Sequence, residues 1–295
     1  MFGKIISALV TPFDENNNVD YESFIKLLNH VSKTHSDSVV IAGTTGEGAT
    51  LSFNEKINLC QIAKQYLPKK IKVILSIGTN NTSETIKLVK KANKINVDGY
   101  LIITPYYNKP SQEGIYQHFK AIDNVSNKPI IIYNVLSRCG VEANFITLIR
   151  LYHDCNHIIG LKHASSNISL IKQLKNEIPS FLIYGGEDRY ILDVFKNGGD
   201  GIISVITNYF GNEVYELIKD YESGFENMTL YEYLQMVSDL CFIESSPSPI
   251  KYILFKNNII LNNLRLPLVS LSSPFKQLID NILEWKSTSI WSTFF

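Results

Sequence analysis

One lysine ends an apolar run and is placed to act as a nucleophile. Lys162 closes residues 157–162, and alternation along a strand puts it on the same face as Ile158 and Gly160. Because Gly160 has no side chain, we expect room beneath Lys162 and a side chain that points into the fold. A desolvated lysine has a lowered pKa, and its neutral amine attacks carbonyl carbons to form Schiff bases. The alternative is a lysine that extends to solvent.

Tyrosines stand at the ends of two other apolar runs. Tyr133 ends residues 129–133, and a buried hydroxyl near a reactive lysine can transfer protons. The chain has 16 tyrosines, so packing in the core is the alternative for any one of them. Tyr106 and Tyr107 follow another run, and adjacent rings cannot both be buried against one face. One of them is therefore expected to be exposed or to reach a partner subunit.

Two features could bind a carboxylate. Residues 43–48, with the sequence GTTGEG, follow an apolar run, and such a loop turns backbone N–H groups and two hydroxyls toward one point. The loop has neither the dinucleotide fingerprint nor a GK[ST] ending, which argues against a nucleotide site. Arg138 follows Tyr133 closely and could hold a carboxylate through two hydrogen bonds. Its alternative is a solvated surface arginine.

Composition argues against several other classes of protein. The 28 basic and 28 acidic residues give no net charge, and binding to nucleic acid or anionic membranes needs a positive excess. No apolar stretch of 18 residues indicates a membrane span. Four scattered cysteines form no CxxC pair, which indicates neither a disulfide framework nor a zinc site. We therefore expect the protein to be located in the reducing cytoplasm. His153 and His157 have metal-compatible spacing but precede a strand, so no metal site is expected.

The elements that must position these residues alternate between strand and helix. Short runs rich in Val, Ile and Leu predict eight strands buried on both faces, at residues 5–10, 38–42, 72–77, 100–104, 129–133, 158–162, 181–184 and 201–205. Eight such units predict an α/β fold, a (β/α)8 TIM barrel, with a doubly wound sheet as the alternative. In a barrel, chemistry lies at the carboxyl ends of the strands.

The strand rhythm stops after Gly224. We therefore predict a catalytic barrel over residues 1–224 and a C-terminal helical subdomain over residues 225–295. In the second part, apolar residues at helical spacing predict a helix: Leu230, Leu234, Val237 and Cys241. In the first part, Ser52 and Glu55 have the spacing of a capping box, which predicts the start of a helix.

The motifs together resemble the pyruvate-dependent class I aldolases, the family that includes N-acetylneuraminate lyase, and within it the dihydrodipicolinate synthase branch. The resemblance covers nearly the whole chain. Its motifs are ALVTPF at 8–13, GTTGE at 43–47, TPYYNKPSQEG at 104–114, YNV at 133–135 with Arg138, GLK at 160–162 and LRLP at 264–267. The PYYNKP stretch and the GTTGE loop are the most specific of these.

The resemblance implies a condensation of pyruvate with aspartate semialdehyde in lysine and diaminopimelate synthesis, without a metal or dissociable cofactor. Lys162 would form the imine with pyruvate, and Arg138 would bind the carboxylate of aspartate semialdehyde. The other implied site residues are Tyr133, Thr44 and Tyr107 in a proton relay, Thr45 at the pyruvate carboxylate, and Gly186 and Ile203 lining the site. Tyr107 would come from the neighbouring subunit of a tight dimer, and two such dimers would form a homotetramer.

Four positions depart from the family pattern: Leu136, Cys139, His163 and Ser246. None of them removes the nucleophile or a proton carrier. They motivate two alternatives, which are a sister pyruvate aldolase acting on sugar acids and a homologue that binds ligands without catalysis. Arg138 and the two threonines of the loop favour the synthase.

Many relatives are inhibited by lysine at the dimer interface. Four positions match those of sensitive members: Ala49, Asn80, Glu84 and Tyr106. Sensitive members often carry histidine or acidic side chains where this chain has Phe53 and Lys56. A cationic Lys56 would oppose a cationic ligand, so we expect weak or absent feedback inhibition. The alternative is that Lys56 points to solvent.

Overall fold

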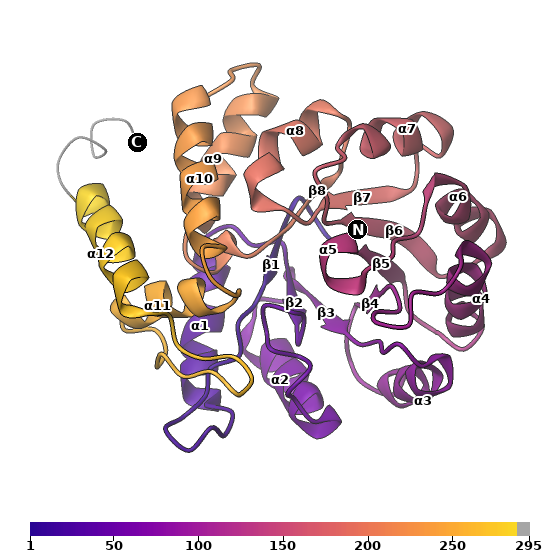
Figure 1. The fold of residues 1–295 in the computed structure, drawn as a ribbon, viewed down its shortest axis with the longest axis horizontal. Helices are drawn as coiled ribbons and strands as arrows, with labels where there is room; N and C mark the ends of the chain where they lie inside the picture. Colours follow the sequence, from indigo (N-terminus) through magenta and orange to yellow (C-terminus); the bar gives the residue numbers. More distant parts are fainter. Residues whose placement is uncertain (288–295) are drawn as a thin grey trace.

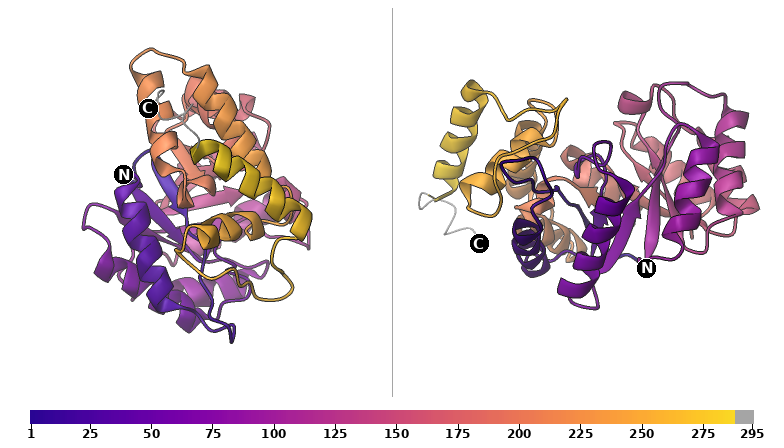
Figure 2. Two further views of the ribbon diagram at one scale, coloured as in Figure 1. Left: turned by 90° about the vertical axis from the view of Figure 1, so that its left-hand side faces the viewer. Right: turned by 90° about the horizontal axis from the view of Figure 1, so that it is seen from below.

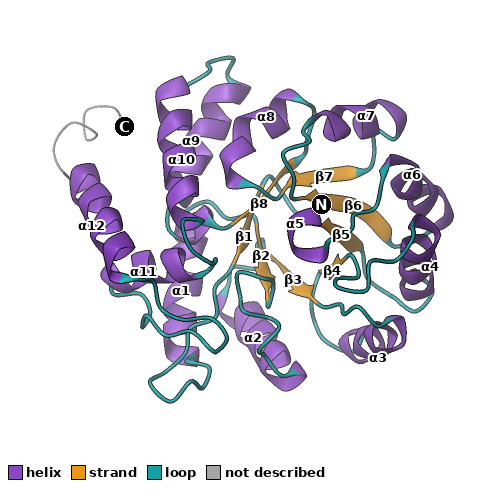
Figure 3. Ribbon diagram, viewed as in Figure 1, coloured by secondary structure: helices purple, strands orange, loops and turns teal. Residues whose placement is uncertain are grey.

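Eight parallel strands form a closed barrel at the centre of the molecule, with helices around it (Figures 1 and 3). The computed structural model describes residues 1–287. The strands are β1 (Ile5–Ala8), β2 (Ser38–Ile41), β3 (Lys72–Ser76), β4 (Gly99–Ile103), β5 (Ile130–Asn134), β6 (Ile158–His163), β7 (Leu182–Gly185) and β8 (Gly201–Ser204). Strand β1 pairs with both β2 and β8, so the predicted (β/α)8 barrel is confirmed and the doubly wound sheet is wrong.

Helices follow the strands and cover the outside of the barrel (Figure 3). Those of the barrel are α1 (Tyr21–Lys33), α2 (Phe53–Tyr66), α3 (Thr82–Ala92), α4 (Gln112–Asp123), α5 (Leu136–Cys139), α6 (Phe145–Asp154), α7 (Ser169–Glu177), α8 (Ile191–Lys196) and α9 (Gly211–Glu222). Two short 3₁₀ helices, η1 (Asp188–Tyr190) and η2 (Ile206–Asn208), follow β7 and β8. Three further helices follow within the described residues: α10 (Met228–Cys241), α11 (Ser248–Lys256) and α12 (Ser273–Ser287).

Local sequence signals explain where these elements begin. The predicted capping box of α2 is present, because the Ser52 side chain accepts from the Glu55 N–H and the Glu55 carboxylate accepts from the Ser52 N–H. Asp20 caps α1 by a simpler arrangement, in which its side chain accepts from the Ser23 N–H. The strands differ from their predicted ranges by no more than about two residues at either end. The pattern of buried β-branched residues was therefore sufficient to locate the barrel.

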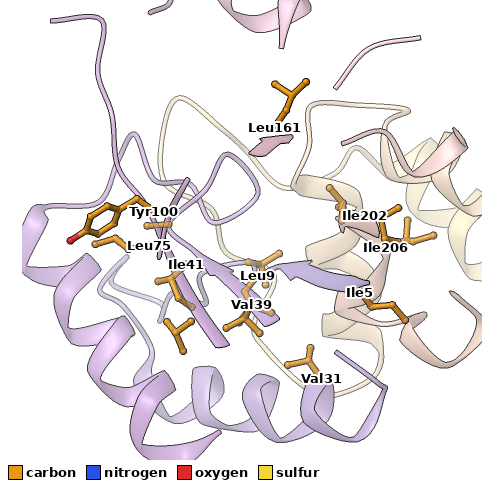
Figure 4. Packing of buried hydrophobic residues seen from close by; sticks show 14 of the residues in the cluster. Ile5, Leu9, Val31, Val39, Ile41, Leu75, Tyr100, Leu161, Ile202 and Ile206 are labelled. Atoms are coloured by element: carbon orange, nitrogen blue, oxygen red, sulfur yellow. The ribbon is translucent and has the colours of Figure 1, made fainter. Parts of the chain in front are cut away.

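Two apolar clusters hold the barrel together. One fills the space between strands and helices, where Val39 and Ile41 of β2 lie near Val31 of α1 (Figure 4). The other fills the barrel interior from its amino end, where Phe2 is buried, to the residues near its carboxyl end. Its members are Phe2, Ile6, Ala8, Val40, Ile74, Leu101, Ile131, Tyr133, Val135, Cys139, Ala164, Tyr184 and Ile203. The interior is thus packed, and in barrels of this kind the chemistry lies at the carboxyl end.

The C-terminal helices lie beside the barrel, next to α1 and α9 (Figures 1 and 2). The predicted helix with Leu230, Leu234 and Val237 is α10. Its buried residues and those of α11 belong to the same apolar cluster as the outer face of the barrel. Gly224 follows α9 with a φ of 87°, which marks the turn where the strand rhythm ends. We keep residues 225–295 as a proposed subdomain, whose helices α10 and α11 share the core of the barrel.

Candidate active site

A pocket of about 300 Å³ opens at the carboxyl ends of the strands, and Lys162 lies in its wall. Lys162 of β6 is in register with Tyr133 of β5, and both side chains are only 6% exposed. The Lys162 Nζ lies 4.4 Å from the centroid of the Tyr133 ring. The lining residues are Thr44, Thr45, Tyr133, Val135, Ser137, Arg138, Lys162, Gly186, Glu187, Val205, Phe242 and Ser246. Six of the eight predicted catalytic and substrate-binding residues therefore meet here.

The space beside Lys162 comes from Gly186 and not from Gly160, which corrects the sequence interpretation. A Cβ atom on Gly160 would lie 2.5 Å from the backbone oxygen of Leu182, so this glycine allows β7 to approach β6. A Cβ atom on Gly186 would lie 2.9 Å from the Lys162 Cε and 2.8 Å from the Ala164 Cβ. Gly186 therefore leaves room for the lysine side chain at the bottom of the pocket.

The glycine-rich loop brings its two threonines to the pocket. Thr45 is buried, and Thr44 is partly exposed to the space in front of Lys162. The loop is closed on itself by backbone hydrogen bonds from the Glu47 N–H to the Thr44 oxygen at 3.0 Å and from the Gly48 N–H to the Gly43 oxygen at 3.0 Å. Both threonines thus line the same pocket as the amine, which is where a carboxylate site is expected.

Arg138 lies on the short helix α5 at the mouth of the pocket. Its side chain is exposed and lines the pocket together with Ser137. Arg138 and Lys162 both lie close enough to act electrostatically on Glu187, the third charged residue of the lining. Two basic side chains therefore line a space into which anionic substrates could enter.

Two of the four departures from the family pattern have structural roles. Cys139 is buried, and its thiol donates to the Thr104 oxygen at 3.2 Å; burial raises the pKa of this thiol to about 11. His163 is also buried, with its Nε2 2.9 Å from the Asn167 oxygen, and burial lowers its pKa. Ser246 lines the pocket, and Leu136 is exposed beside it. Only Ser246 is thus placed to contact a substrate in this pocket.

Two predicted site residues lie outside the pocket. Ile203 is fully buried in the barrel interior, in the same cluster as Tyr133, and packs beneath the site. Tyr107 is 85% exposed, and its φ of 73° is unusual for a residue with a side chain. The Tyr107 N–H donates to the Cys139 oxygen at 3.3 Å, which ties this turn to α5. Non-glycine residues in this conformation cluster at functional sites.

Glu187, which is half-buried, and Asp188, which is buried, are two acidic residues that the sequence analysis did not single out. Burial, with Asp188 nearby, raises the pKa of Glu187, while Lys162 and Arg138 act in the opposite direction. Asp188 is fully buried, and its carboxylate accepts from the N–H groups of Val205 and Ile206 at 2.9 and 3.0 Å. Both follow β7 directly, so the rule that strand ends carry the chemistry was the signal that could have found them.

A second pocket of about 450 Å³ adjoins the first. It is lined by Ala49, Lys56 and Tyr106 of the predicted regulatory set. The two pockets share Thr44, Tyr133, Arg138 and Ser246. Lys56 is half-buried, and burial lowers its pKa, so its side chain does not extend freely into solvent.

The other two predicted regulatory residues are placed differently. The Asn80 oxygen accepts from the side chain of Asn108 at 2.9 Å, and Glu84 pairs with Lys87 on α3.

Across residues 1–287, no group of three or more His, Cys, Asp or Glu side chains could hold a metal ion. None of the helices described is long and apolar enough to cross a membrane.

Comparison with known proteins gives the family. The model of the dihydrodipicolinate synthetase family matches residues 1–286, nearly the whole chain. The chain belongs to this family. The dihydrodipicolinate synthetase relative from Bacillus subtilis, named 4-hydroxy-tetrahydrodipicolinate synthase, is 38% identical over 274 residues, which are 92% of this chain and 94% of the relative.

Solved structures of dihydrodipicolinate synthases have the same fold. The enzyme from Cyanidioschyzon merolae, solved with lysine bound, matches with a TM-score of 0.92 at 33% identity, covering 96% of this chain and 97% of that chain. The chloride-inhibited enzyme from Acinetobacter baumannii, complexed with pyruvate, also has a TM-score of 0.92 at 33% identity, covering 96% and 98%. The resemblance inferred from the sequence motifs is confirmed.

Proposed function

We propose that this chain is a 4-hydroxy-tetrahydrodipicolinate synthase, which condenses pyruvate with aspartate semialdehyde through a Schiff base on Lys162. The observation that carries the proposal is the contact between the Lys162 amine and the Tyr133 ring in a pocket that Thr44 also lines. An amine nucleophile beside a hydroxyl proton carrier is the arrangement that imine chemistry needs. Membership of the dihydrodipicolinate synthetase family supports the choice of substrates.

The first step is attack of the Lys162 amine on the carbonyl carbon of pyruvate. The carbonyl oxygen leaves as water, and the positively charged imine makes the adjacent methyl group acidic. Loss of one methyl proton gives an enamine, whose carbon attacks the aldehyde of the second substrate. Tyr133 and Thr44 line this space, and their hydroxyls would transfer the protons. The amine itself activates the carbonyl, so the proposed reaction uses no metal and no dissociable cofactor.

The pocket suits two small acids. Its volume of about 300 Å³ is at the small end of the usual range for ligand sites. Thr45 and its loop would hold the pyruvate carboxylate deep in the pocket, and Arg138 at the mouth would bind the carboxylate of aspartate semialdehyde. Gly186 leaves the space that the imine occupies.

The proposal includes assembly with a second subunit. Tyr107 is exposed in the single chain and is held in an unusual backbone conformation, which supports a role at a neighbouring subunit's site. We propose a tight dimer in which Tyr107 completes the proton relay, with two such dimers forming a homotetramer. The four buried, unpaired cysteines are consistent with the reducing cytoplasm in which we place the enzyme.

The test compares two substrate pairs. Condensation should occur with pyruvate and aspartate semialdehyde, and not with pyruvate and N-acetylmannosamine, the pair that a sister aldolase would use. Borohydride reduction with pyruvate should add one lactyl group to the peptide that carries Lys162. The Lys162→Ala variant should lose this adduct and nearly all activity, whereas Lys172→Ala, at an exposed position of α7, should keep both. An adduct on another lysine would disprove the mechanism.

A further inference from the structure

An ion pair that solvent does not reach lies behind the glycine-rich loop. The Lys251 Nζ of α11 is 2.6 Å from the Glu47 Oε1, and both side chains are 0% exposed. The same Nζ donates to the Thr11 oxygen at 2.8 Å and lies 4.4 Å from the centroid of the Phe13 ring. Removing two charges from water is costly, and an apolar pair often stabilises a fold equally well. Stability alone is therefore a weak reason for this pair.

The second oxygen of the Glu47 carboxylate is also held from the C-terminal part of the chain. Its Oε2 accepts from the Arg265 N–H at 3.0 Å. The Arg265 guanidinium in turn donates to the Thr50 oxygen at 3.0 Å and pairs with Glu55 at 2.6 Å. The helix α11, through Lys251, and the segment after it, through Arg265, thus both hold the Glu47 carboxylate.

The carboxylate that is held belongs to a residue with an unusual backbone conformation. Glu47 has a φ of 52°, in the left-handed region that residues with side chains adopt only when their surroundings enforce it. In this conformation the Glu47 N–H donates to the Thr44 oxygen at 3.0 Å. The position of the carboxylate is therefore coupled through one residue and one hydrogen bond to the backbone of Thr44, whose side chain lines the pocket.

We propose that Lys251 is a positioning residue for the condensation: by binding the Glu47 carboxylate it holds the glycine-rich loop, and with it Thr44, in the geometry that proton transfer requires. This inference rests on the proposed function. It assigns an indirect part in the reaction to the helix α11, which is remote in sequence from every residue of the pocket except Phe242 and Ser246.

The test uses the double variant Lys251→Met/Glu47→Gln. It removes both charges together, so no uncompensated charge is buried, and the fold should be retained. Borohydride trapping of pyruvate on Lys162 should still occur, and the KM for pyruvate should stay within about threefold. The kcat of condensation should fall about ten- to hundredfold, the effect expected when a catalytic group moves by up to about 1 Å. The single variant Glu47→Gln keeps a side-chain oxygen near Lys251 but leaves the buried ammonium without a counter-charge, so its kcat should also fall.

A matched control separates positioning from stability. Lys256 of the same helix pairs with Asp280 of α12 at 3.2 Å, away from the loop. The Lys256→Met/Asp280→Asn variant should lower the melting temperature without changing kcat. Equal losses of kcat in both double variants, or an unchanged kcat in Lys251→Met/Glu47→Gln, would overturn the inference. If that variant does not fold, an unchanged kcat in Glu47→Gln overturns it instead. Absence of an imine in the unaltered enzyme would refute the proposed function itself.

Discussion

A methyl group added at Gly186 tests how closely the pocket is fitted around the reactive lysine. In Gly186→Ala the new Cβ would lie 2.9 Å from the Lys162 Cε, 2.8 Å from the Ala164 Cβ and 3.0 Å from the Ala164 Cα. Ordinary contacts of a Cβ atom begin at 3.4 Å. Ala164 directly follows β6, so both the lysine side chain and the end of this strand must shift, by about 0.5 Å or more.

We expect this displacement to act on the first chemical step. Overpacking of this kind costs about 1–3 kcal/mol in the free energy of unfolding. A nucleophile displaced by up to about 1 Å can lose as much as a hundredfold in rate. The rate of imine formation, followed by borohydride trapping and mass spectrometry, should therefore fall about ten- to hundredfold, with a similar fall in kcat/KM for pyruvate.

The control is Gly114→Ala, in the first turn of α4 and outside the pocket. There the new Cβ would lie 3.1 Å from the Pro110 Cβ, a milder contact that also gains helix propensity. This variant should form the imine at the normal rate. If Gly186→Ala traps pyruvate within about twofold of the unaltered rate, Gly186 does not shape the space around Lys162, and our account of the pocket is wrong.

Three further predictions follow from the charged and titrating groups. Arg138→Ala should lower kcat/KM for aspartate semialdehyde about tenfold to a hundredfold while imine formation with pyruvate continues; loss of the imine with normal use of aspartate semialdehyde would contradict the assignment. Lysine should inhibit weakly or not at all, because half-buried Lys56 lines the second pocket, and half-inhibition at sub-millimolar lysine in a steady-state assay would show otherwise. Burial lowers the pKa of His118 to about 4, so the native state binds fewer protons than the unfolded chain below pH 6.5. The free energy of unfolding should therefore fall by up to about 3 kcal/mol as the pH drops to 4. Urea titrations across this range should show a shallower pH dependence for His118→Gln and an unaltered one for His153→Gln, at an exposed position.

The sequence was sufficient for the features that depend on local pattern. Buried runs of β-branched residues located the strands, and the period-two alternation in β6 correctly directed Lys162 into the barrel. The sequence did not show which glycine leaves the space beside Lys162. Whether Gly160 or Gly186 provides it depends on how β7 approaches β6, which is a property of the packed barrel. No local pattern contains that distance.

Two other residues show the same limit. The partner of Glu47 is 204 positions away, and nothing in the loop indicates which distant cation meets it. The motif containing Tyr107 identified the family, yet the single chain leaves this side chain 85% exposed. Its proposed place in the relay needs a second copy of the chain, and the order of residues in one chain carries no information on how two copies meet.

The buried pair between Lys251 and Glu47 also has a consequence for how the molecule is made. During synthesis the eight strands leave the ribosome before α11, because β8 ends at Ser204 and α11 begins at Ser248. A nascent barrel can therefore close while the Glu47 carboxylate still lacks its cation. The contacts that hold the glycine-rich loop form only after α11 and Arg265 have been synthesised. A protein truncated at residue 224 would contain Lys162, Tyr133 and both threonines and still be an unfinished enzyme. The proposed positioning of Thr44 is therefore complete only after the C-terminal part of the chain has folded onto the barrel.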